Sequence, residues 1–396
     1  NIINSSAVEY SNKAATKCSL SSTGSPVSNV LINPFNYGLL GTRIINKTYE
    51  WQSERVNQQH AHGIRFDGTL SEYKPFYALN SSSGNWFKIN EVGHIYYSST
   101  SPYSLWRTYE NATYFNENGK LVESKDALDV FQAVLYGYDK INGKVPVASA
   151  SNATVQQIAF DGFEDYKNLG GLENNINGIN NSHFDFSGLQ SSNVSINSVN
   201  RHSGFASLQV NANSAVSTSK VLSAYLNPVP PTAITSNYLL QSCQCTPNFN
   251  PTPGKYVLSA WIKGNGKIDV KLLNPSTSTS TTNSSTKILT IDGWNKVEVI
   301  FDVLPYHSKI EVVLNNSSIT QASYFDDLRI HPFLAEMTTV VYNPITFQPI
   351  ATHDSNNMTT YYNYDGRYVL TRIRLETIEG IKTIKELSSG VKKRYY

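Results

Sequence analysis

The fold class is decided by the run Lys255-Tyr256-Val257-Leu258-Ser259-Ala260-Trp261-Ile262-Lys263, whose side chains repeat with a period of two. That period is typical of a half-buried β-strand. It recurs in residues 267–272, 295–301 and 309–314, with Gly, Asn, Asp and Pro between the runs. Repeated short strands separated by turn residues favour a β-sandwich over a parallel α/β sheet. We therefore expect a sandwich domain over residues 153–335.

Two regions precede this sandwich. Residues 1–30 are polar, and we interpret them as a loosely packed lead-in. Residues 31–152 are rich in aromatic side chains and turn residues, which indicates short β elements. One short helix is expected near residues 125–136, because Ser124 or Asp126 can cap its first amides and Gly137 suits its end. Its apolar stripe would consist of Leu128, Phe131, Val134 and Leu135.

A long insertion and a tail complete the predicted organisation. Residues 227–254 contain six prolines and two of the three cysteines, Cys243 and Cys245, and loops of this length are often functional. Residues 336–396 follow the sandwich, and residues 338–344 and 359–367 there look like two copies of one unit, with Tyr342 and Tyr364 at equivalent positions. A unit that short cannot close a core alone. The tail must therefore pack on the sandwich or on another chain.

Composition restricts the class of function. Charged residues are 16% of the 396 residues and the formal net charge is +2, which argues against nucleic acid as a partner. No apolar run is long enough for a transmembrane helix. A surface rich in Asn, Ser, Thr and Tyr, and a start at Asn1 without Met, suit a processed extracellular protein at the cell surface. A disulfide from Cys18 to Cys243 or Cys245 stays open.

The tail carries the first of three resemblances. Tyr364-Asp365-Gly366-Arg367 resembles the tyrosine-aspartate (YD) repeats of Rhs-type proteins, although the copy at Tyr342 has Asn343 in place of the aspartate. The sandwich resembles the galactose-binding-like jelly rolls of carbohydrate-binding modules. That second resemblance lies in residues 161–164, 202–204, 256–264 and 325–330. It implies a jelly-roll fold and says little about the ligand.

The layout of the whole chain carries the third resemblance. The order of Asn33-Pro34-Phe35, Phe66-Asp67-Gly68-Thr69, the helix near residue 125, the jelly roll and the repeat is similar to that of large surface proteins of Bacteroidota. Such proteins commonly leave by type 9 secretion, and some belong to gliding motility. The resemblance implies outer-membrane or surface proteins, such as type 9 translocon components, as partners.

Candidate sites follow from chemistry and from the jelly-roll resemblance. Jelly rolls of this type hold a structural Ca²⁺ where the first and last strands meet, and Glu164 and Asp326 match those positions. The alternative is that both carboxylates accept backbone amides. Loop aromatics for a glycan or a protein partner are Tyr225, Tyr238 and Phe249. We expect Trp261 and Trp294 to lie in the core.

Catalytic motifs are lacking in the sequence. It contains no Gly-x-Ser-x-Gly elbow, no His-Glu-x-x-His helix and no phosphate-binding glycine loop. His60 and His62 are expected to be a surface pair, and alternation along a strand should turn Asp326 and Asp327 to opposite faces. We therefore expect a non-enzymatic secreted protein that docks on outer-membrane machinery or other surface proteins. The alternatives are a freestanding glycan-binding adhesin and a fragment of a larger Rhs-type toxin or enzyme.

Overall fold

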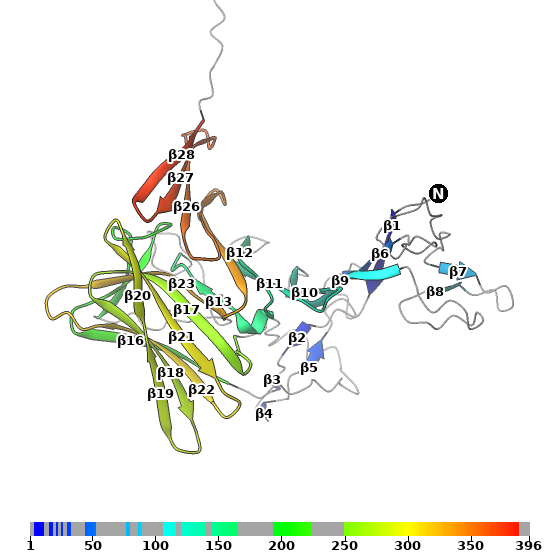
Figure 1. Ribbon diagram of the computed structural model, residues 1–396, viewed down its shortest axis with the longest axis horizontal. Helices are drawn as coiled ribbons and strands as arrows, with labels where there is room; N and C mark the ends of the chain where they lie inside the picture. The colour runs from blue at the N-terminus through cyan, green and yellow to red at the C-terminus, as the bar shows by residue number, and fades with distance from the viewer. Residues whose placement is uncertain are drawn as a thin grey trace, which may run out of the picture. The chain divides into compact units, whose positions relative to one another are not determined.

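The protein is described by a computed structural model (Figure 1). It describes residues 4–11, 16–18, 21–22, 25–26, 30–32, 44–52, 77–79, 86–88, 106–115, 120–138, 145–164, 193–222 and 249–387. The chain divides into two compact units, residues 1–131 with 229–245 and residues 132–228 with 246–396. Among the described residues the regular elements are strands, apart from one 3₁₀ turn, η1 (Val155–Gln157). The expectation of a mostly β chain is confirmed. No helix in the described ranges is long and apolar enough to span a membrane.

The first unit contains an antiparallel sheet in the order β1, β6, β9, β10. Its strands are β1 (Asn4–Ser11), β6 (Ile44–Gln52), β9 (Trp106–Phe115) and β10 (Leu121–Asp126). Three two-stranded pairs accompany it: β2 (Thr16–Cys18) with β5 (Val30–Ile32), β3 (Ser21–Ser22) with β4 (Ser25–Pro26), and β7 (Tyr77–Leu79) with β8 (Trp86–Lys88). Strand β1 pairs with β6 along its whole length, so residues 4–11 of the predicted lead-in are part of a sheet.

The helix predicted near residues 125–136 is wrong. Strand β10 ends at Asp126, a turn follows, and β11 (Phe131–Gly137) begins. Asp126 Oδ1 accepts hydrogen bonds from the amides of Leu128 and Val130, and Asp129 has a left-handed φ of 60°. The carboxylate that could cap a helix therefore closes a hairpin turn instead, as aspartate commonly does. In β11, Phe131, Ala133 and Leu135 recur with a period of two, and burial alternates along the strand, so the same sequence also suits a strand.

The second unit contains the predicted sandwich. One sheet has the order β14, β15, β23, β17, β21, β20, with β13 also paired to β23, and the other has the order β16, β22, β18, β19 (Figure 1). The first sheet consists of β13 (Ala159–Asp161), β14 (Val194–Asn197), β15 (Ser207–Val210), β17 (Gly254–Lys263), β20 (Thr286–Ile291), β21 (Trp294–Val303) and β23 (Ser323–Pro332). The second consists of β16 (Ser214–Val221), β18 (Gly266–Asn274), β19 (Thr279–Ser284) and β22 (Lys309–Asn316).

The core lies between these sheets because each presents alternate side chains to the other. On β21, Val297, Val299, Phe301 and Val303 are at most 5% exposed, while the intervening Ile300 is 49% exposed. From the opposite sheet Ile268, Val270 and Leu272 enter the same cluster. Burying apolar area in this way is the main favourable term in folding.

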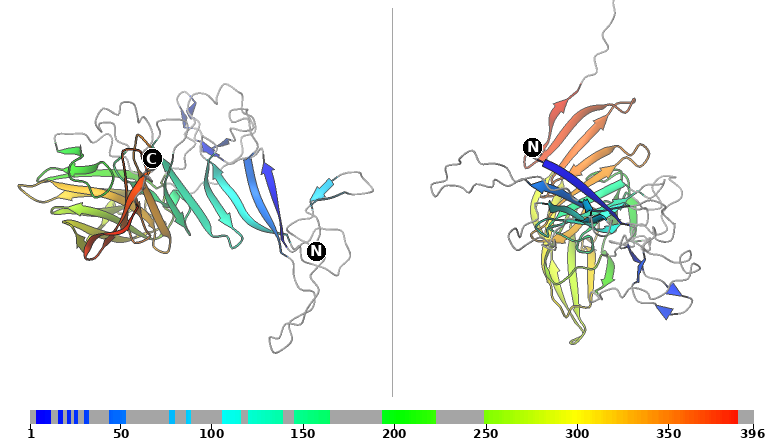
Figure 2. Two further views of the ribbon diagram at one scale, coloured as in Figure 1. Left: turned by 90° about the horizontal axis from the view of Figure 1, so that it is seen from above. Right: turned by 90° about the vertical axis from the view of Figure 1, so that its right-hand side faces the viewer.

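A third sheet, the tail sheet, packs beside the sandwich in the same unit (Figure 2). Its order is β11, β12, β24, β25, β26, β27, β28. The members not yet defined are β12 (Val145–Ser151), β24 (Glu336–Tyr342), β25 (Pro349–His353), β26 (Thr359–Tyr364), β27 (Leu370–Thr377) and β28 (Gly380–Glu386). Strand β12 lies in the predicted junction before residue 153 and pairs with β24, so the predicted boundary does not coincide with the division into units.

Candidate functional site

Two hairpins of the tail sheet, β25–β26 and β26–β27, are closed by one kind of turn. Asp365 Oδ1 accepts the amides of Arg367 and Val369, and Tyr368 has a φ of 62°. These backbone hydrogen bonds lower the pKa of the exposed Asp365 carboxyl. Asp354 Oδ1 holds the turn to β26 by the same two bonds, to Asn356 and Met358. The two turns set the register of β25 to β27 and thereby the positions of the side chains above these strands.

Arg329 and Trp261 bind the tail sheet to the sandwich. The buried Arg329 guanidinium donates to Ser259 Oγ at 3.0 Å and to the carbonyl oxygens of Met337, Asp354 and Ser355 at 2.7–2.9 Å. The indole Nε1 of Trp261, on β17, donates to the carbonyl of Asn357 at 2.9 Å. The side chains of Trp261 and Trp294 are 0% and 6% exposed, which confirms them as core residues. The tail therefore packs on the sandwich of its own chain.

The carboxylate pair, Glu164 and Asp326, lies beneath the His202 loop (residues 198–206). Glu164 Oε1 accepts the amides of Phe205 and Ala206, and Asp326 Oδ2 accepts those of His202 and Ser203. Asp326 Oδ1 accepts the amide of Asp327. Burial, and then the neighbouring carboxylates, raise the pKa of Asp326 well above its ordinary value.

Backbone amides donate to Glu164 and Asp326, the two residues of the predicted calcium site. Amide hydrogens reach three of the four oxygens of the carboxylate pair, whereas Ca²⁺ needs six to eight oxygen ligands. The observed bonds are those of the alternative, in which the carboxylates hold backbone amides. Calcium at Glu164 and Asp326 stays a prediction.

Asp326 and Asp327 do not point to opposite sides, so that expectation is wrong. Asp327 Oδ1 accepts the Ser203 hydroxyl, and its Oδ2 lies 2.8 Å from His202 Nδ1, so both aspartates meet the same loop. The cause is a bulge in the pairing of β17 with β23, where Asp327 takes a φ of 51°. Left-handed backbone at a residue other than glycine costs on the order of 1 kcal/mol and is often kept at functional sites. Both carboxylates are fully buried, which excludes direct contact with a soluble substrate.

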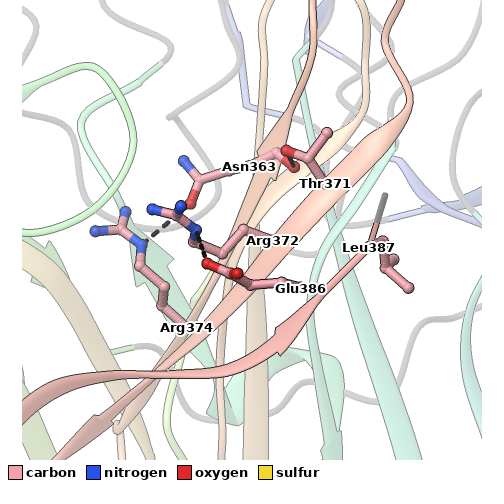
Figure 3. Close-up of a pocket in the computed structure, with 6 residues that line it drawn as sticks. All are labelled: Asn363, Thr371, Arg372, Arg374, Glu386 and Leu387. Atoms are coloured by element: carbon pink, nitrogen blue, oxygen red, sulfur yellow. Dashed lines mark hydrogen bonds and ion pairs between the residues drawn. The ribbon is translucent and has the colours of Figure 1, made fainter. Parts of the chain in front are cut away.

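A polar groove crosses the tail sheet above β26 and β27. One end is a hollow of about 590 Å³, lined by Asn363, Thr371, Arg372, Arg374, Glu386 and Leu387. Figure 3 shows Asn363, Arg372 and Arg374 projecting from neighbouring strands to the same side, with Arg372 paired to Glu386. The other end is a hollow of about 300 Å³ beside the His202 loop, and Asn363 and Arg374 line both ends. The two hollows therefore adjoin at Asn363 and Arg374.

Three guanidinium groups face this groove. Arg374 Nε donates to Asn363 Oδ1 at 3.0 Å, and its guanidinium lies 5.4 Å from the centre of the Tyr361 ring. Arg201 lies 5.6 Å from the centre of the Phe205 ring and donates one bond to the carbonyl of Ser198. Within the described part of the chain the Nη atoms of Arg374 make no hydrogen bond. The aromatic rings restrict the guanidinium groups of Arg374 and Arg201, whose remaining N–H groups stay able to donate, while Arg372 is held by Glu386.

Of the predicted aromatic site, only Phe249 lies among the described residues. Tyr225 and Tyr238 lie outside the described residues, as do His60, His62, Cys243 and Cys245. Phe249 is 3% exposed and belongs to the sandwich core, so the expectation that its ring meets a ligand is wrong. Its place at the entrance to β17 lets the ring fill the core instead of facing solvent.

Sequence reasoning missed the groove because its residues come from separate parts of the chain. Arg372 and Arg374 alternate on β27, which is a period-two signal for one face of a strand. That signal could have placed them on the same side of the tail. Nothing local relates them to Arg201, which reaches the groove only because the tail sheet packs against the His202 loop.

No family model and no curated protein matches this chain. Among solved structures, "Family 16 Carbohydrate Binding Module-2" is 15% identical with a TM-score of 0.25, over 37% of this chain and 89% of that chain. TmCBM61 in complex with β-1,4-galactotriose is 14% identical with a TM-score of 0.22, over 36% and 84%. The C-terminal family 22 carbohydrate-binding module of Clostridium thermocellum Xyn10B is 13% identical with a TM-score of 0.23, over 37% and 82%. Similarity at these values carries no argument about a ligand.

Proposed function

We propose that this chain binds an acidic glycan, without catalysis, in the groove above β26 and β27. The observation that carries the proposal is the convergence of Arg201, Arg372 and Arg374 on one open surface, against a single carboxylate, Glu386. A planar guanidinium matches a carboxylate or a sulfate with two parallel hydrogen bonds. A net positive lining therefore favours uronic acid or sulfated sugars over neutral ones.

The other groups of the groove suit the hydroxyls of a sugar. Asn363 and Thr371 offer amide and hydroxyl groups, and the Phe205 ring is 36% exposed at the end beside the His202 loop. Aromatic faces stack on the C–H surfaces of sugar rings while polar groups bind the hydroxyls, directly or through water. The combination supports a polymer that lies along the groove.

The same lining supports the proposal of binding without turnover. Glycoside hydrolysis commonly requires two carboxyl groups on either side of the scissile bond. Glu386 is the only carboxylate among the described lining residues, and it is paired with Arg372 at 3.1 Å. The acids at the seam with the sandwich, Asp326, Asp327 and Glu376, are buried. An attachment function outside the cell is consistent with this arrangement.

A second function, docking on surface or outer-membrane proteins, is favoured by the last strand. Within residues 249–387, β28 pairs with β27 alone and stands at the end of the sheet order. An unpaired edge can accept a strand from a partner. Such a partner would include the type 9 secretion or gliding components implied by the sequence resemblance. Cross-linking of the native protein in its own cells, followed by mass spectrometry, tests this function. Recovery of the chain without any surface protein would contradict it.

The glycan function is tested by affinity electrophoresis in gels that contain single polysaccharides. Polygalacturonate, alginate and a sulfated galactan serve as acidic polymers, and xylan and a neutral galactan as controls. The full chain should be retarded by at least one acidic polymer, and less so at high salt. Replacing Arg374 with Gln should weaken that binding at least about tenfold, because a lost charged hydrogen bond is worth roughly 1.5 kcal/mol or more.

Arg367→Gln is the matched control, since Arg367 belongs to the same tail and does not line the groove. It removes one positive charge and should leave retardation unchanged. If both variants lose retardation equally, the binding depends only on the net charge of the chain, and a specific binding groove is contradicted. If only neutral polymers retard the chain, its function is still glycan binding, but the proposal of an acidic glycan is rejected.

A further inference from the structure

Two histidines and an aspartate meet at the buried seam between the sandwich and the tail sheet. His202 belongs to the His202 loop, Asp327 to β23 and His353 to the end of β25. Asp327 Oδ2 lies 2.8 Å from His202 Nδ1 and 3.1 Å from His353 Nε2. One donor atom from each of the three residues lies within 4.8 Å of the other two. Around a tetrahedral cation with ligands at about 2 Å the donor atoms lie about 3.3 Å apart, so these side chains need to separate by only a few tenths of an ångström to admit one.

The far nitrogen of each imidazole is held by its own partner. His202 Nε2 lies 2.9 Å from Glu376 Oε1, and the other oxygen of Glu376 accepts the amide of Thr359. His353 Nδ1 lies 2.8 Å from Thr339 Oγ1. Metal-binding histidines are commonly held in this way, because a carboxylate or other acceptor on the second nitrogen fixes the ring and its tautomer. His202 therefore directs Nδ1 toward Asp327, and His353 directs Nε2.

One of these nitrogens lacks a hydrogen bond. His353 is 1% exposed, and its Nε2 makes no hydrogen bond within the described residues although it lies 3.1 Å from Asp327 Oδ2. A buried polar atom left unsatisfied is costly, so such atoms usually have a function or a bound partner. A cation between the two residues would satisfy the nitrogen and the carboxylate together.

We propose that His202, Asp327 and His353 bind a divalent transition metal, with Zn²⁺ as the best fit. Two imidazole nitrogens and one carboxylate oxygen are ligands that zinc accepts readily, whereas Ca²⁺ and Mg²⁺ prefer oxygen alone. The ligands come from three segments, one of them in the tail sheet and two in the sandwich. The metal would therefore cross-link the tail to the sandwich and fix the wall of the groove that His202 lines.

The test uses the full chain after treatment with a chelator and dialysis. Titration with zinc chloride, followed by calorimetry, should show one equivalent bound per chain and a higher melting temperature in the metal-bound form. Cobalt chloride should give the visible absorption of a four-coordinate Co²⁺ site, and Zn²⁺ should abolish it. Failure of stoichiometric binding by the folded wild-type chain would overturn the proposal.

Two variants and one control locate the metal. His353→Gln removes a ligand. Thr339→Val removes the hydroxyl that holds His353 Nδ1, with little change in side-chain volume. Each variant should weaken zinc binding at least about tenfold. Thr339→Val keeps the test valid if His353→Gln does not fold. The double variant His60→Gln, His62→Gln should bind zinc as the wild type does. Loss of the metal in that double variant, or unchanged affinity in Thr339→Val, would reject the site.

Discussion

Replacing Arg329 with Met should lower the free energy of unfolding by about 3 kcal/mol, on the following grounds. The guanidinium makes four hydrogen bonds, to one hydroxyl and three carbonyl oxygens. At roughly 1.5 kcal/mol for each bond from a charged donor, the four contribute about 6 kcal/mol. Burial opposes them, because it lowers the pKa of Arg329 to about 10, which corresponds to roughly 3 kcal/mol against the charged form. The difference is the predicted loss.

Urea unfolding followed by tryptophan fluorescence measures this loss. Trp261 reports on the same seam, since its indole donates to the carbonyl of Asn357 in the turn that Arg329 also holds. Hydrogen exchange at residues 354–358 gives the local reading, and that turn should lose protection in Arg329→Met. Arg367→Met is the control, because Arg367 is exposed and its loss should change stability by no more than about 0.5 kcal/mol.

A result for Arg329→Met within about 0.5 kcal/mol of the control would refute this reasoning. It would mean that the cost of burying the guanidinium cancels its hydrogen bonds, as happens for some buried charges. The tail would then be held on the sandwich by apolar packing and by the bonds of Trp261 and Asn357.

Three further predictions concern the sandwich. A Cβ at Gly204, which has a φ of +61°, would overlap Glu164 Oε1, so Gly204→Ala should destabilise the fold by about 2–4 kcal/mol in urea unfolding. Burial, and then the charge of Arg329, lower the pKa of His331 from 6.5 to about 4, with Glu298 opposing, so the unfolded chain binds more protons between these values. His331 should therefore contribute a rise in stability of up to about 3 kcal/mol from pH 4 to 6.5, measured in thermal melts as the difference between the pH profiles of the wild type and His331→Gln; identical profiles would be contrary to it. If the carboxylate pair binds Ca²⁺, a calcium chelator should lower the melting temperature, whereas an unchanged temperature favours the amide-holding alternative.

The sandwich could be predicted from sequence because its strands carry their signal locally. Alternation along residues 255–263 and 295–301 was sufficient to place Trp261 and Trp294 in the core. The helix prediction failed because residues 124–137 satisfy two periods at once. Asp126 decided between them by closing a turn, and the same bonds recur at Asp354 and Asp365. In all three hairpins the aspartate stands three residues before a left-handed residue, Asp129, Asn357 or Tyr368, which share no residue type.

The groove and the buried histidine cluster could not be predicted in the same way. His202 and Asp327 are 125 residues apart, and His202 and Glu376 are 174 residues apart. Their meeting depends on packing between the His202 loop and the tail sheet, which no local pattern encodes. A bulge at Asp327 also reversed the side expected for its carboxylate. Sequence periodicity cannot show a single residue in left-handed backbone within a strand.

The central claim is that the groove above β26 and β27 binds an acidic glycan. Hydrogen exchange with mass spectrometry, on the full chain with and without an acidic polysaccharide that retards it, tests the location most directly. We predict that the polysaccharide slows exchange in residues 359–377 and 198–206 of the wild type and does not slow it in Arg374→Gln. Protection confined to residues 227–248, or an equal pattern in wild type and Arg374→Gln, would contradict the groove as the binding site.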